Sequence, residues 1–490
     1  MTPGSRFMFA FLAFCLVGAA GCASLGPEYQ RPELGASVPR AWLQGPEGSG
    51  ERGAQERWWE AFGRPALDRL VQDVLERNLD IREAAARVLE VRARLTSSRA
   101  ERFPKVDLEA GARRQRQTVT TTVPTLQGPV QEERRATVDS HSLSLPASFE
   151  LDLWGRLARA EEAALQDLLQ AEENRRTVIQ GAVAEAVSLY LQTEALERRL
   201  HITRGRIENY EQSLALVERR YEHGLTSILD VRQARRSLAR AQALLPPIRQ
   251  DLGKARHALS VLAGRYPKAG DPGAPPETAF RRMAPVPAGV PSDLLERRPD
   301  IRAAEASLRA SNARVGEALA SRFPRISLTG SFGFSSETLN RLLEPESELW
   351  NIAMGVAYPL FDAGRLKAAQ RAAEARYRQG AAAYARTVLG AFAEVEDALL
   401  TRQEQLERRK RVLEFLEEAR VTQEVAESRY SRGLVDYLNV LEAVQTRYQA
   451  EEDVVLVDLA IATNRVALHR ALGGGWPSSA ETTNRKTSSR

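Results

Sequence analysis

Histidine and cysteine are the side chains of this sequence that could take part in metal or covalent chemistry, and there are five and two of them. The histidines are scattered, and no pair of them has a metal-ligand spacing such as H-E-x-x-H. The sequence also has no G-x-S-x-G nucleophile motif and no P-loop. We therefore expect no catalytic residue, no metal site and no cofactor, which argues against an enzyme.

Cys22 stands in a pattern that points to covalent modification. It follows a basic residue, an apolar run from Phe7 to Val17 and four small residues. This order is typical of a signal peptide and is too short for a stable membrane anchor. It resembles a bacterial lipobox, although Ala19 stands where leucine is commonest. We interpret residues 1–21 as a signal peptide and Cys22 as a lipid attachment site; an ordinary secretory signal with a chance cysteine is the alternative.

The residues around this cysteine also indicate where the mature protein is located. Removal of residues 1–21 would remove Cys15, so the mature chain would have one cysteine and no disulfide. Ala23 and Ser24 follow Cys22, and because no Asp follows it directly, the usual sorting pattern favours the outer membrane. The net charge of +5 comes from 69 basic and 64 acidic residues that are interleaved, which indicates a solvated helical surface and gives no case for nucleic acid as a partner.

The sequence is a tandem duplication. The motifs Asp-Ile-Arg at 80–82 and Arg-Phe-Pro at 102–104 return 220 positions later (300 − 80 and 322 − 102). Gly-Arg-Leu at 155–157 and Arg-Tyr-x-x-Gly-Leu at 220–225 return 209 positions later (364 − 155 and 429 − 220). One unit therefore occurs twice, and its first copy has eleven extra residues (220 − 209) between Pro104 and Gly155.

Each copy predicts the same elements. Helix formers dominate from Leu67 to Ala100 and from Leu294 to Ser321, and each helix should end at the following Phe-Pro pair. Apolar or small residues then alternate with polar ones at about 105–151 and 325–360, which predicts a β-hairpin in each copy. Residues 156–223 and 365–432 contain no proline, so each could be a helix on the order of 100 Å long. A second helix should return to about Ala263 and Leu472.

These elements define the predicted domain organisation. The signal peptide is followed by an extended, lipidated arm at 22–57 and by the first repeat at 58–264, with its long helical hairpin at about 156–264. A linker rich in proline and glycine covers 265–292. The second repeat covers 293–472, with its helical hairpin at about 365–472, and a disordered tail covers 473–490.

Four strands per chain are too few to close a membrane barrel, since the smallest single-chain barrels need about eight. An open sheet edge cannot face lipid, where each unpaired backbone group costs several kcal/mol. Several chains must therefore share a barrel, and three would supply twelve strands. The long helices are too charged to enter lipid and would form a tube outside the bilayer. The fold class is thus mainly α with membrane β; a helical bundle decorated with hairpins is the alternative.

The ordered set of motifs resembles the TolC-like outer-membrane efflux protein family, in its lipoprotein branch. The likeness covers nearly the whole chain and rests on Cys22 with Gly-Pro-Glu-Tyr at 26–29, on Trp58-Trp59, and on the motifs that occur twice. It implies a homotrimer with a twelve-stranded barrel in the outer membrane and a long periplasmic α-helical barrel. It implies a gated duct without catalysis, which passes small molecules such as drugs from an inner-membrane transporter of the resistance-nodulation-division type held by a periplasmic adaptor protein.

In this family the helix-turn-helix tips close the periplasmic end, and the adaptor docks there. The matching residues are 221–227, here called the first tip, and 430–436, here called the second tip. The implied docking residues are Gly224, Leu225, Thr226, Ser227, Gly433, Leu434, Val435 and Asp436. Gly224 and Gly433 must end helices in any case, so docking is an addition to that structural role.

The resemblance also implies a pore constriction. Leu438 and Glu442, one helical turn apart on one face, match a leucine ring and an acidic ring. Glutamate replaces the more usual aspartate, and Asn439 stands where some relatives have a second acid, so cation selectivity should be weaker.

Asp230 matches an acid that in some relatives contacts a tyrosine and an arginine in the closed state. Tyr430 matches the tyrosine, which allows an Asp230–Tyr430 hydrogen bond, but Val435 occupies the arginine position and allows no salt bridge there. The alternative is that Asp230 is an acid favoured by the helix dipole.

Two other functions remain open at this point. One is an outlet for type I protein secretion, against which the lipobox and the family branch argue. The other is a non-conducting structural lipoprotein of the envelope, which trimerisation and ion conductance would exclude.

Overall fold

A computed structural model describes residues 24–32, 41–43, 57–125, 128–267, 286 and 291–474. The predicted signal peptide and Cys22 lie outside the described residues, as do much of the predicted arm and linker and the tail from residue 475 onward.

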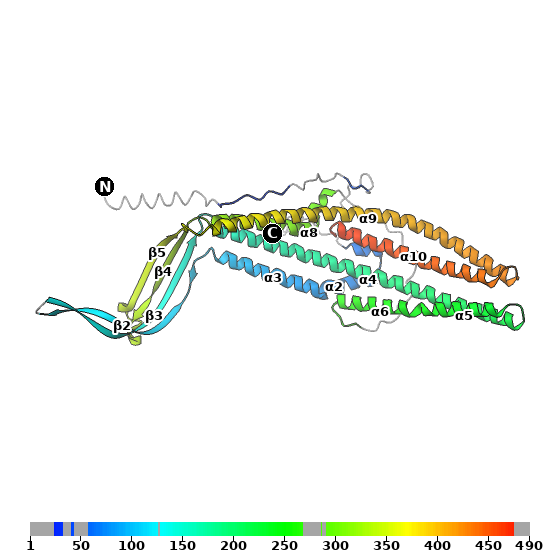
Figure 1. Cartoon of the computed structure of the whole chain (residues 1–490), viewed down its shortest axis with the longest axis horizontal. Helices are drawn as coiled ribbons and strands as arrows, with labels where there is room; N and C mark the ends of the chain where they lie inside the picture. Colours follow the sequence, from blue (N-terminus) through cyan, green and yellow to red (C-terminus); the bar gives the residue numbers. More distant parts are fainter. Residues whose placement is uncertain are drawn as a thin grey trace. The chain divides into compact units, whose positions relative to one another are not determined.

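The two halves of the chain share one overall plan, in which helices are followed by a β-hairpin, a long helix and a helical return (Figure 1). The first half runs through the 3₁₀ helix η1 (Trp58–Phe62), α2 (Pro65–Arg77), α3 (Leu79–Ala100), β1 (Lys105–Val106), β2 (Glu109–Thr125), β3 (Gly128–Leu151), α4 (Arg156–Glu222), α5 (Ile228–Ala243) and α6 (Leu245–Leu262). The second runs through η2 (Pro291–Asp293), α7 (Leu294–Arg297), α8 (Pro299–Ala320), β4 (Arg325–Ser336), η3 (Leu339–Arg341), η4 (Pro345–Ser347), β5 (Glu348–Ala357), α9 (Arg365–Ser431) and α10 (Tyr437–Ala471).

The described residues fall into two compact units. The first lies within Met1–Pro32, Leu89–Leu169 and Ala306–Ala382 and contains all the strands. The second lies within Glu33–Val88, Gln170–Glu305 and Ala383–Arg490 and contains both tips. Among the described residues, no helix combines the length and the apolar character that crossing a membrane requires.

The strands form one antiparallel sheet in the order β1-β3-β4-β5, with β2 also pairing with β3. The β3–β4 register runs from His141 opposite Ser336 to Leu151 opposite Ile326. The β4–β5 register runs from Phe334 opposite Glu348 to Arg325 opposite Ala357. The predicted β-hairpins are therefore joined edge to edge through β3 and β4.

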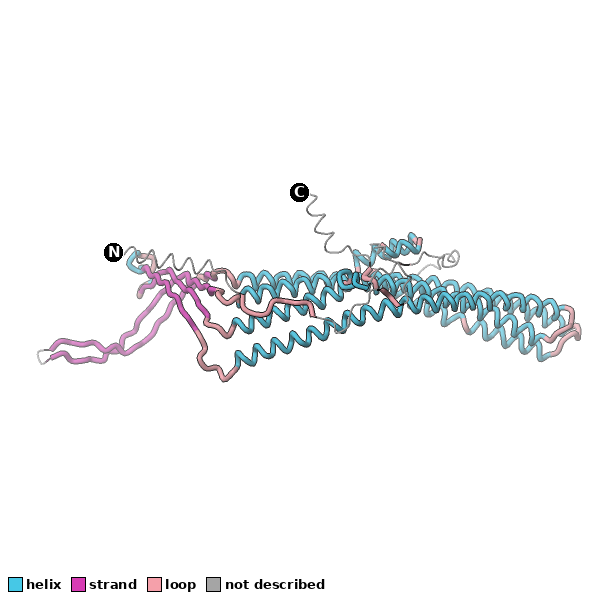
Figure 2. Tube along the Cα trace, turned by 90° about the horizontal axis from the view of Figure 1, so that it is seen from above, coloured by secondary structure: helices cyan, strands magenta, loops and turns pink. Residues whose placement is uncertain are grey.

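The first hairpin is the longer one, and it contains the extra residues of the first copy. β2 pairs with β3 as far as Thr125 opposite Gly128, whereas β4 accompanies β3 only up to His141. The part of the first hairpin that reaches from Arg113 opposite Ser140 to Thr125 opposite Gly128 is a two-stranded ribbon, which pairs with no other described strand (Figure 2).

The prediction of one continuous helix over Leu67–Ala100 is wrong, because the helix is broken at Asn78. The structure has two helices, α2 and α3, with Asn78 between them in a non-helical conformation. The buried Asn78 side chain accepts a hydrogen bond from the N–H of Ile81 (3.0 Å) and donates one to the carbonyl of Leu262, the last residue of α6 (2.9 Å). One local and one long-range hydrogen bond thus stabilise the break, and the second ties the start of α3 to the end of α6.

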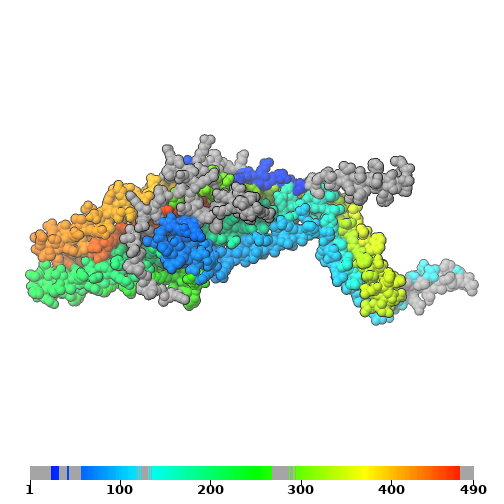
Figure 3. All heavy atoms as spheres, turned by 180° about the vertical axis from the view of Figure 1, so that it is seen from behind, coloured from blue at the N-terminus to red at the C-terminus, as the bar shows by residue number. Residues whose placement is uncertain are grey.

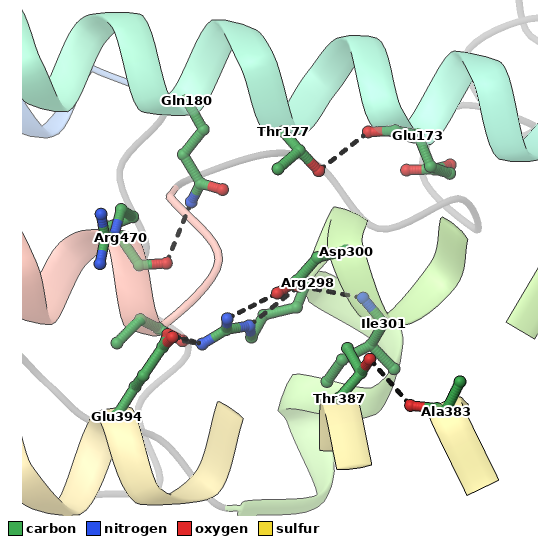
Figure 4. Close-up of polar contacts among 11 residues, drawn as sticks. Glu173, Thr177, Gln180, Arg298, Asp300, Ile301, Ala383, Thr387, Glu394 and Arg470 are labelled. Atoms are coloured by element: carbon green, nitrogen blue, oxygen red, sulfur yellow. Dashed lines mark hydrogen bonds and ion pairs between the residues drawn. The ribbon is translucent and has the colours of Figure 1, made fainter. Parts of the chain in front are cut away.

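Arg298 takes the equivalent place between α7 and α8, 220 positions after the asparagine (298 − 78). Its Nη1 donates to the carbonyl of Ala471, the last residue of α10 (3.0 Å), and to Glu394 (2.8 Å), while Nε and Nη2 hold both carboxylate oxygens of Asp300 (Figure 4). Ala471 lies 209 positions after Leu262 (471 − 262), so the two halves make the same junction with different side chains. The predicted helix over Leu294–Ser321 is accordingly also divided.

The returning helices differ between the halves. In the second half one helix, α10, runs from Tyr437 to Ala471. In the first half, the single helix predicted to return to about Ala263 is two helices, α5 and α6, which meet at Leu244. Pro246 and Pro247 explain the break, because proline has no N–H to continue the helical hydrogen-bond ladder.

Candidate functional site at the helix tips

Both tips end a long helix in the same way. Gly224 has φ +72°; its N–H donates to the carbonyl of Tyr221 (2.9 Å), and the N–H of Leu225 donates to Arg220 (2.8 Å). Gly433, with φ +74°, repeats both bonds at 2.9 and 3.0 Å. This is the Schellman motif, which needs a left-handed residue. A methyl group on either glycine would meet nothing within 4 Å, so the backbone conformation rather than space requires glycine here.

The residues after the glycines are exposed. In a Schellman motif the residue after the left-handed one usually packs back on the helix, but Leu225 and Leu434 are 66% and 60% exposed. Val435 is half-buried, and Ser227 and Asp436 are exposed. Each tip therefore presents an apolar side chain at its outermost turn. The two tips lie side by side (Figure 3, green and orange).

Asp230 caps the helix that follows the first tip. Ser227 is the N-cap of α5, and a reciprocal capping box joins its backbone and side chain to those of Asp230, at 3.3 and 3.4 Å. The hydroxyl of Thr226 also donates to the Asp230 carboxylate. The alternative interpretation of Asp230, as an acid at the start of a helix, therefore agrees with the hydrogen bonds that it makes. The second tip differs, because its N-cap Asp436 makes no such side-chain bond.

The hydrogen bond between Asp230 and Tyr430 that the resemblance allowed is absent from the single chain. The Tyr430 side chain is buried, and its hydroxyl has no hydrogen-bond partner within the described structure. The ring instead packs against Tyr437, with centroids 5.4 Å apart, and Arg220 lies over its face at 4.8 Å. Asp230 is committed to the helix cap, which is the physical reason for the difference.

Below the tips, aromatic residues fill the space between the hairpins. The Tyr437 hydroxyl lies 2.8 Å from the Ser213 hydroxyl, and burial raises the pKa of Tyr437 to about 12. The hydroxyl of Tyr448 donates to the carbonyl of Gly205 at 3.0 Å. Both bonds join α4 to α10. The sequence alone does not predict this cluster, because tyrosines at helical spacing carry no sign of which other helix they will contact.

Leu438 and Glu442 lie on the exposed side of α10, between the buried Tyr437, Val440 and Leu441. Leu438 is 54% exposed. The Glu442 carboxylate has no hydrogen bond or ion pair with another described residue. An apolar and an acidic side chain therefore share one face of α10 close to the second tip, and both are free to contact something outside the single chain.

No group of His, Cys, Asp and Glu residues that could hold a metal ion occurs in the part of the chain that the structure describes. Cys22, the predicted lipid attachment site, lies outside that part.

Comparison with known proteins gives the same assignment for both halves. The sequence profile described as "Outer membrane efflux protein" matches residues 70–265 and again residues 290–474. The chain is 35% identical over 471 residues to the solvent efflux pump outer membrane protein SrpC of Pseudomonas putida, covering 94% of this chain and 97% of that protein. It is 31% identical over 468 residues to the cation efflux system protein CusC of Escherichia coli O6:H1, covering 95% and 98%.

A comparison with solved structures gives the same family. The solved structure of the outer-membrane channel OprN is similar to this chain, with a TM-score of 0.84 and 30% sequence identity, and the match covers 93% of this chain and 100% of that one. These findings confirm the predicted family and fold class. Since the profile matches both halves and the relatives match over almost their full length, this chain belongs to the outer membrane efflux protein family and is an outer-membrane component of an efflux system.

Proposed function

We propose that three copies of this chain form a gated duct, which receives small molecules from an inner-membrane transporter through a periplasmic adaptor protein and releases them outside the cell. The trimer, the two partners and the residue roles given below are the substance of the proposal. The duct would have no catalytic step, since the energy would enter at the inner-membrane transporter.

The sheet of the single chain carries this proposal. Residues that pair directly across strands share a face, and one face is apolar in successive rows. These rows are Leu151–Ile326–Val356, Phe149–Leu328–Met354, Ala147–Gly330–Ile352 and Leu145–Phe332–Trp350. The opposite face has Ser148, Thr329 and Asn351. Every residue of β5 is exposed in the single chain, so an apolar face with an open edge is left for other partners.

Lipid and further copies of the sheet fit these two features. An apolar face of this kind suits hydrocarbon, whereas an open strand edge in lipid must be paired. Three copies of the four longer strands would close a twelve-stranded barrel with the apolar face outward and the polar face lining the duct.

The exposed face of α10 supports a constriction. In a trimer, Leu438 and Glu442 would each occur three times around the axis and form an apolar ring above an acidic ring. Such rings would restrict large solutes while the duct is closed and would favour cations over anions. Asp230 would support the closed state by fixing the start of α5, and Tyr430 by filling the core beneath the tips.

The tips are the proposed docking surface for the adaptor. Gly224 and Gly433 shape the turns, and Leu225 and Leu434 offer exposed apolar contacts. Thr226, Ser227, Val435 and Asp436 complete the surface.

The lipid anchor is the last part of the proposal. At the N-terminus of the mature chain, Cys22 would carry acyl chains that anchor the arm in the outer membrane. The barrel would make a second contribution to membrane affinity.

The substrate class is small molecules. SrpC is named for solvent efflux and CusC for cation efflux. The apolar and acidic rings of this chain are compatible with uncharged and cationic solutes, and the inner-membrane transporter would make the finer selection.

The proposed trimer is tested by the mass of the membrane-extracted protein in mild detergent, first unheated and then boiled. We expect three times the chain mass, 54.3 kDa per chain less the signal peptide, before heating and one chain mass after it. A monomer in both samples would contradict the shared barrel. Labelling with radioactive fatty acid tests the anchor, and Cys22→Ser should abolish the label while the trimer persists.

A further inference from the structure

The ribbon of the first hairpin, residues 113–125 and 128–140, extends past the rest of the sheet (Figure 2). β4 ends at Ser336 and β5 begins at Glu348, and neither pairs with the ribbon. The strands connect to α3 and α4 at the opposite end of the sheet. If the helices lie in the periplasm, as proposed, the ribbon extends toward the outside of the cell.

One face of the ribbon continues the apolar face of the sheet. Side chains alternate between the two faces along a strand, so every second residue of β3 beyond Leu143 lies on the same face as Leu143 and Leu145. The next rows on this face are Ala112–His141, Arg114–Asp139, Arg116–Thr137 and Thr118–Arg135. The face therefore changes from apolar to basic within a few residues.

The position of this change fits the edge of a membrane. The apolar rows run from Leu151 to Leu143, which is eight residues (151 − 143). At ~3.3 Å per residue and a strand tilt of about 40°, they span about 20 Å of the ~25 Å apolar band of a membrane barrel. Phe332, Phe334 and Trp350 lie in the last of these rows, and aromatic side chains are typical of the membrane–water interface. By the same measure the arginine rows begin just beyond the band, at about 30 Å from Leu151.

Two arginines of this face carry charges that the described side chains do not neutralise. Arg114 pairs with Asp139 at 3.4 Å. Arg116 and Arg135 are exposed, and neither has an ion pair or hydrogen bond with a side chain that the structure describes, including Glu133 one row further out. They are diagonal neighbours on adjacent rows, a spacing that long side chains can bridge. Because like charges so close repel each other, an anion between them would be favourable.

We propose that Arg116 and Arg135 bind a phosphate group of lipid A, the phosphorylated glycolipid of the outer leaflet. Guanidinium groups bind phosphate oxygens through paired, charge-assisted hydrogen bonds. The position of the two arginines selects this lipid, since they lie at the level of the headgroups, on the lipid-facing side and at the outer end of the sheet. The inference rests on the proposed barrel and its orientation, and it adds a specific lipid contact that would hold the barrel at a fixed depth.

The opposite face of the ribbon supplies a matched control. Arg113 pairs with Ser140 and lies on the face that would turn toward the duct, away from lipid. It is exposed like Arg116, lies on the same strand and is only three residues away. Arg113→Gln and Arg116→Gln therefore remove the same charge from opposite faces of one strand.

Titration with lipid A tests the inference on the full-length protein in detergent micelles. Native mass spectrometry counts the lipid A molecules bound to each trimer. Arg116→Gln combined with Arg135→Gln should weaken binding about tenfold, because charge-assisted hydrogen bonds to the phosphate are lost. Arg116→Gln alone should weaken it less, and Arg113→Gln should leave it unchanged. Equal effects of the two single variants, or no effect of the double variant, would overturn the inference.

Two further probes identify the chemistry that is recognised. Lipid A without its phosphates and phosphatidylglycerol should both bind the wild type more weakly than lipid A. Equal binding of the first would mean that the acyl chains alone are recognised. Equal binding of the second would mean that any anionic lipid suffices. Either result would contradict the assignment to lipid A.

The yield of heat-dissociable trimer separates this inference from the proposed function. It should be the same in all variants, because the ribbon pairs with no other described strand. A conducting trimer that binds lipid A equally well in every variant would leave the duct standing and remove the lipid site. Absence of any wild-type trimer would instead overturn the proposed function itself.

Discussion

His469 is a buried side chain that the structure holds neutral. Its ring stacks on Trp58 with centroids 4.9 Å apart and an interplanar angle of 15°, and its Nε2 has no hydrogen-bond partner within the described structure. Burial, with a smaller contribution from the charge of Arg465, lowers the pKa of His469 to about 3. At neutral pH the ring is uncharged in both the folded and the unfolded chain. In acid, however, the unfolded chain binds a proton that the folded chain does not.

The free energy of unfolding should therefore fall as the pH drops from 6.5 toward 3. Between pH 7 and pH 4.5, His469 alone should account for about 3 kcal/mol of that loss. His469→Phe keeps a ring against Trp58 and removes the proton site, so it should lose less stability than the wild type over this interval. Denaturant unfolding in detergent at both pH values measures this. His257→Gln, at an exposed position on α6, is the control, and equal losses in all three proteins would contradict the assignment.

Asp230 and Glu442 should behave differently although both are acidic residues near the tips. Asp230→Ala removes the capping box of α5 and should cost about 1 kcal/mol. Glu442→Ala removes no contact within the described chain and should leave the thermal unfolding temperature unchanged. Thermal unfolding of the two variants, followed by circular dichroism, tests the contrast. A loss of stability in Glu442→Ala that matches the loss in Asp230→Ala would show that Glu442 has a structural role.

At the scale of elements, the ends of the helices depend on two kinds of glycine. Gly224 needs only a left-handed backbone. Gly264, with φ +65°, ends α6 so close to the end of α2 that an added Cβ would meet the carbonyl oxygen of Arg77. Gly473 repeats this arrangement against Arg297, with a nearest approach of 3.2 Å.

Alanine should therefore cost more at Gly264 than at Gly224. Gly224→Ala should lower the free energy of unfolding only by the cost of a left-handed backbone at alanine, about 1 kcal/mol. Gly264→Ala adds a steric clash with backbone that cannot move freely, so its free energy of unfolding should decrease by clearly more. Chemical denaturation of the two variants measures the difference. Equal effects would mean that the junction of α2 and α6 is loose rather than close-packed.

The sequence predicted most elements because their signals are local. Proline-free runs predicted α4 and α9, period-two alternation predicted the hairpins, and repeated glycines predicted the tips. The breaks at Asn78 and Arg298 could not be predicted in this way, since each depends on a carbonyl at the end of a helix far along the chain. The break between α5 and α6, in contrast, has a local signal in the sequence, the pair Pro246-Pro247.

The candidate site was predicted only in part. The glycines and the capping position of Asp230 follow from helix-end chemistry. The partners of Tyr430 do not, because Tyr430, Arg220 and Tyr437 come from three different helices, α9, α4 and α10, and meet only in the folded hairpins. The stack of Trp58 on His469 likewise joins residues at opposite ends of the chain.

At the scale of the whole molecule, the two faces of the sheet should respond differently to charge. Ile352 lies on the apolar face opposite Gly330, and its neighbour Asn351 lies on the other face opposite Ser331. In the proposed barrel, Ile352→Lys would place a cation in lipid at a cost of about 2–4 kcal/mol. Asn351→Lys would place it in the aqueous duct at little cost. The yield of heat-dissociable trimer in outer membranes should fall for the first variant only; equal yields would contradict the orientation of the sheet.

At the scale of the assembly, the duplication means that each chain carries two similar helical hairpins, so the proposed trimer would have six around its axis. Within a chain, the two hairpins are joined near the tips by buried tyrosines from α4, α9 and α10.

The conductance of the purified trimer in a planar lipid bilayer tests the proposed duct most directly. We expect the wild type to insert and to show a small, mostly closed, weakly cation-selective conductance. The double variant Asp230→Ala, Glu442→Ala should conduct more, because it loses a helix cap and the acidic ring beside the tips. Insertion without any conductance in either protein, or a large open conductance that is the same in both, would contradict a duct closed at these tips.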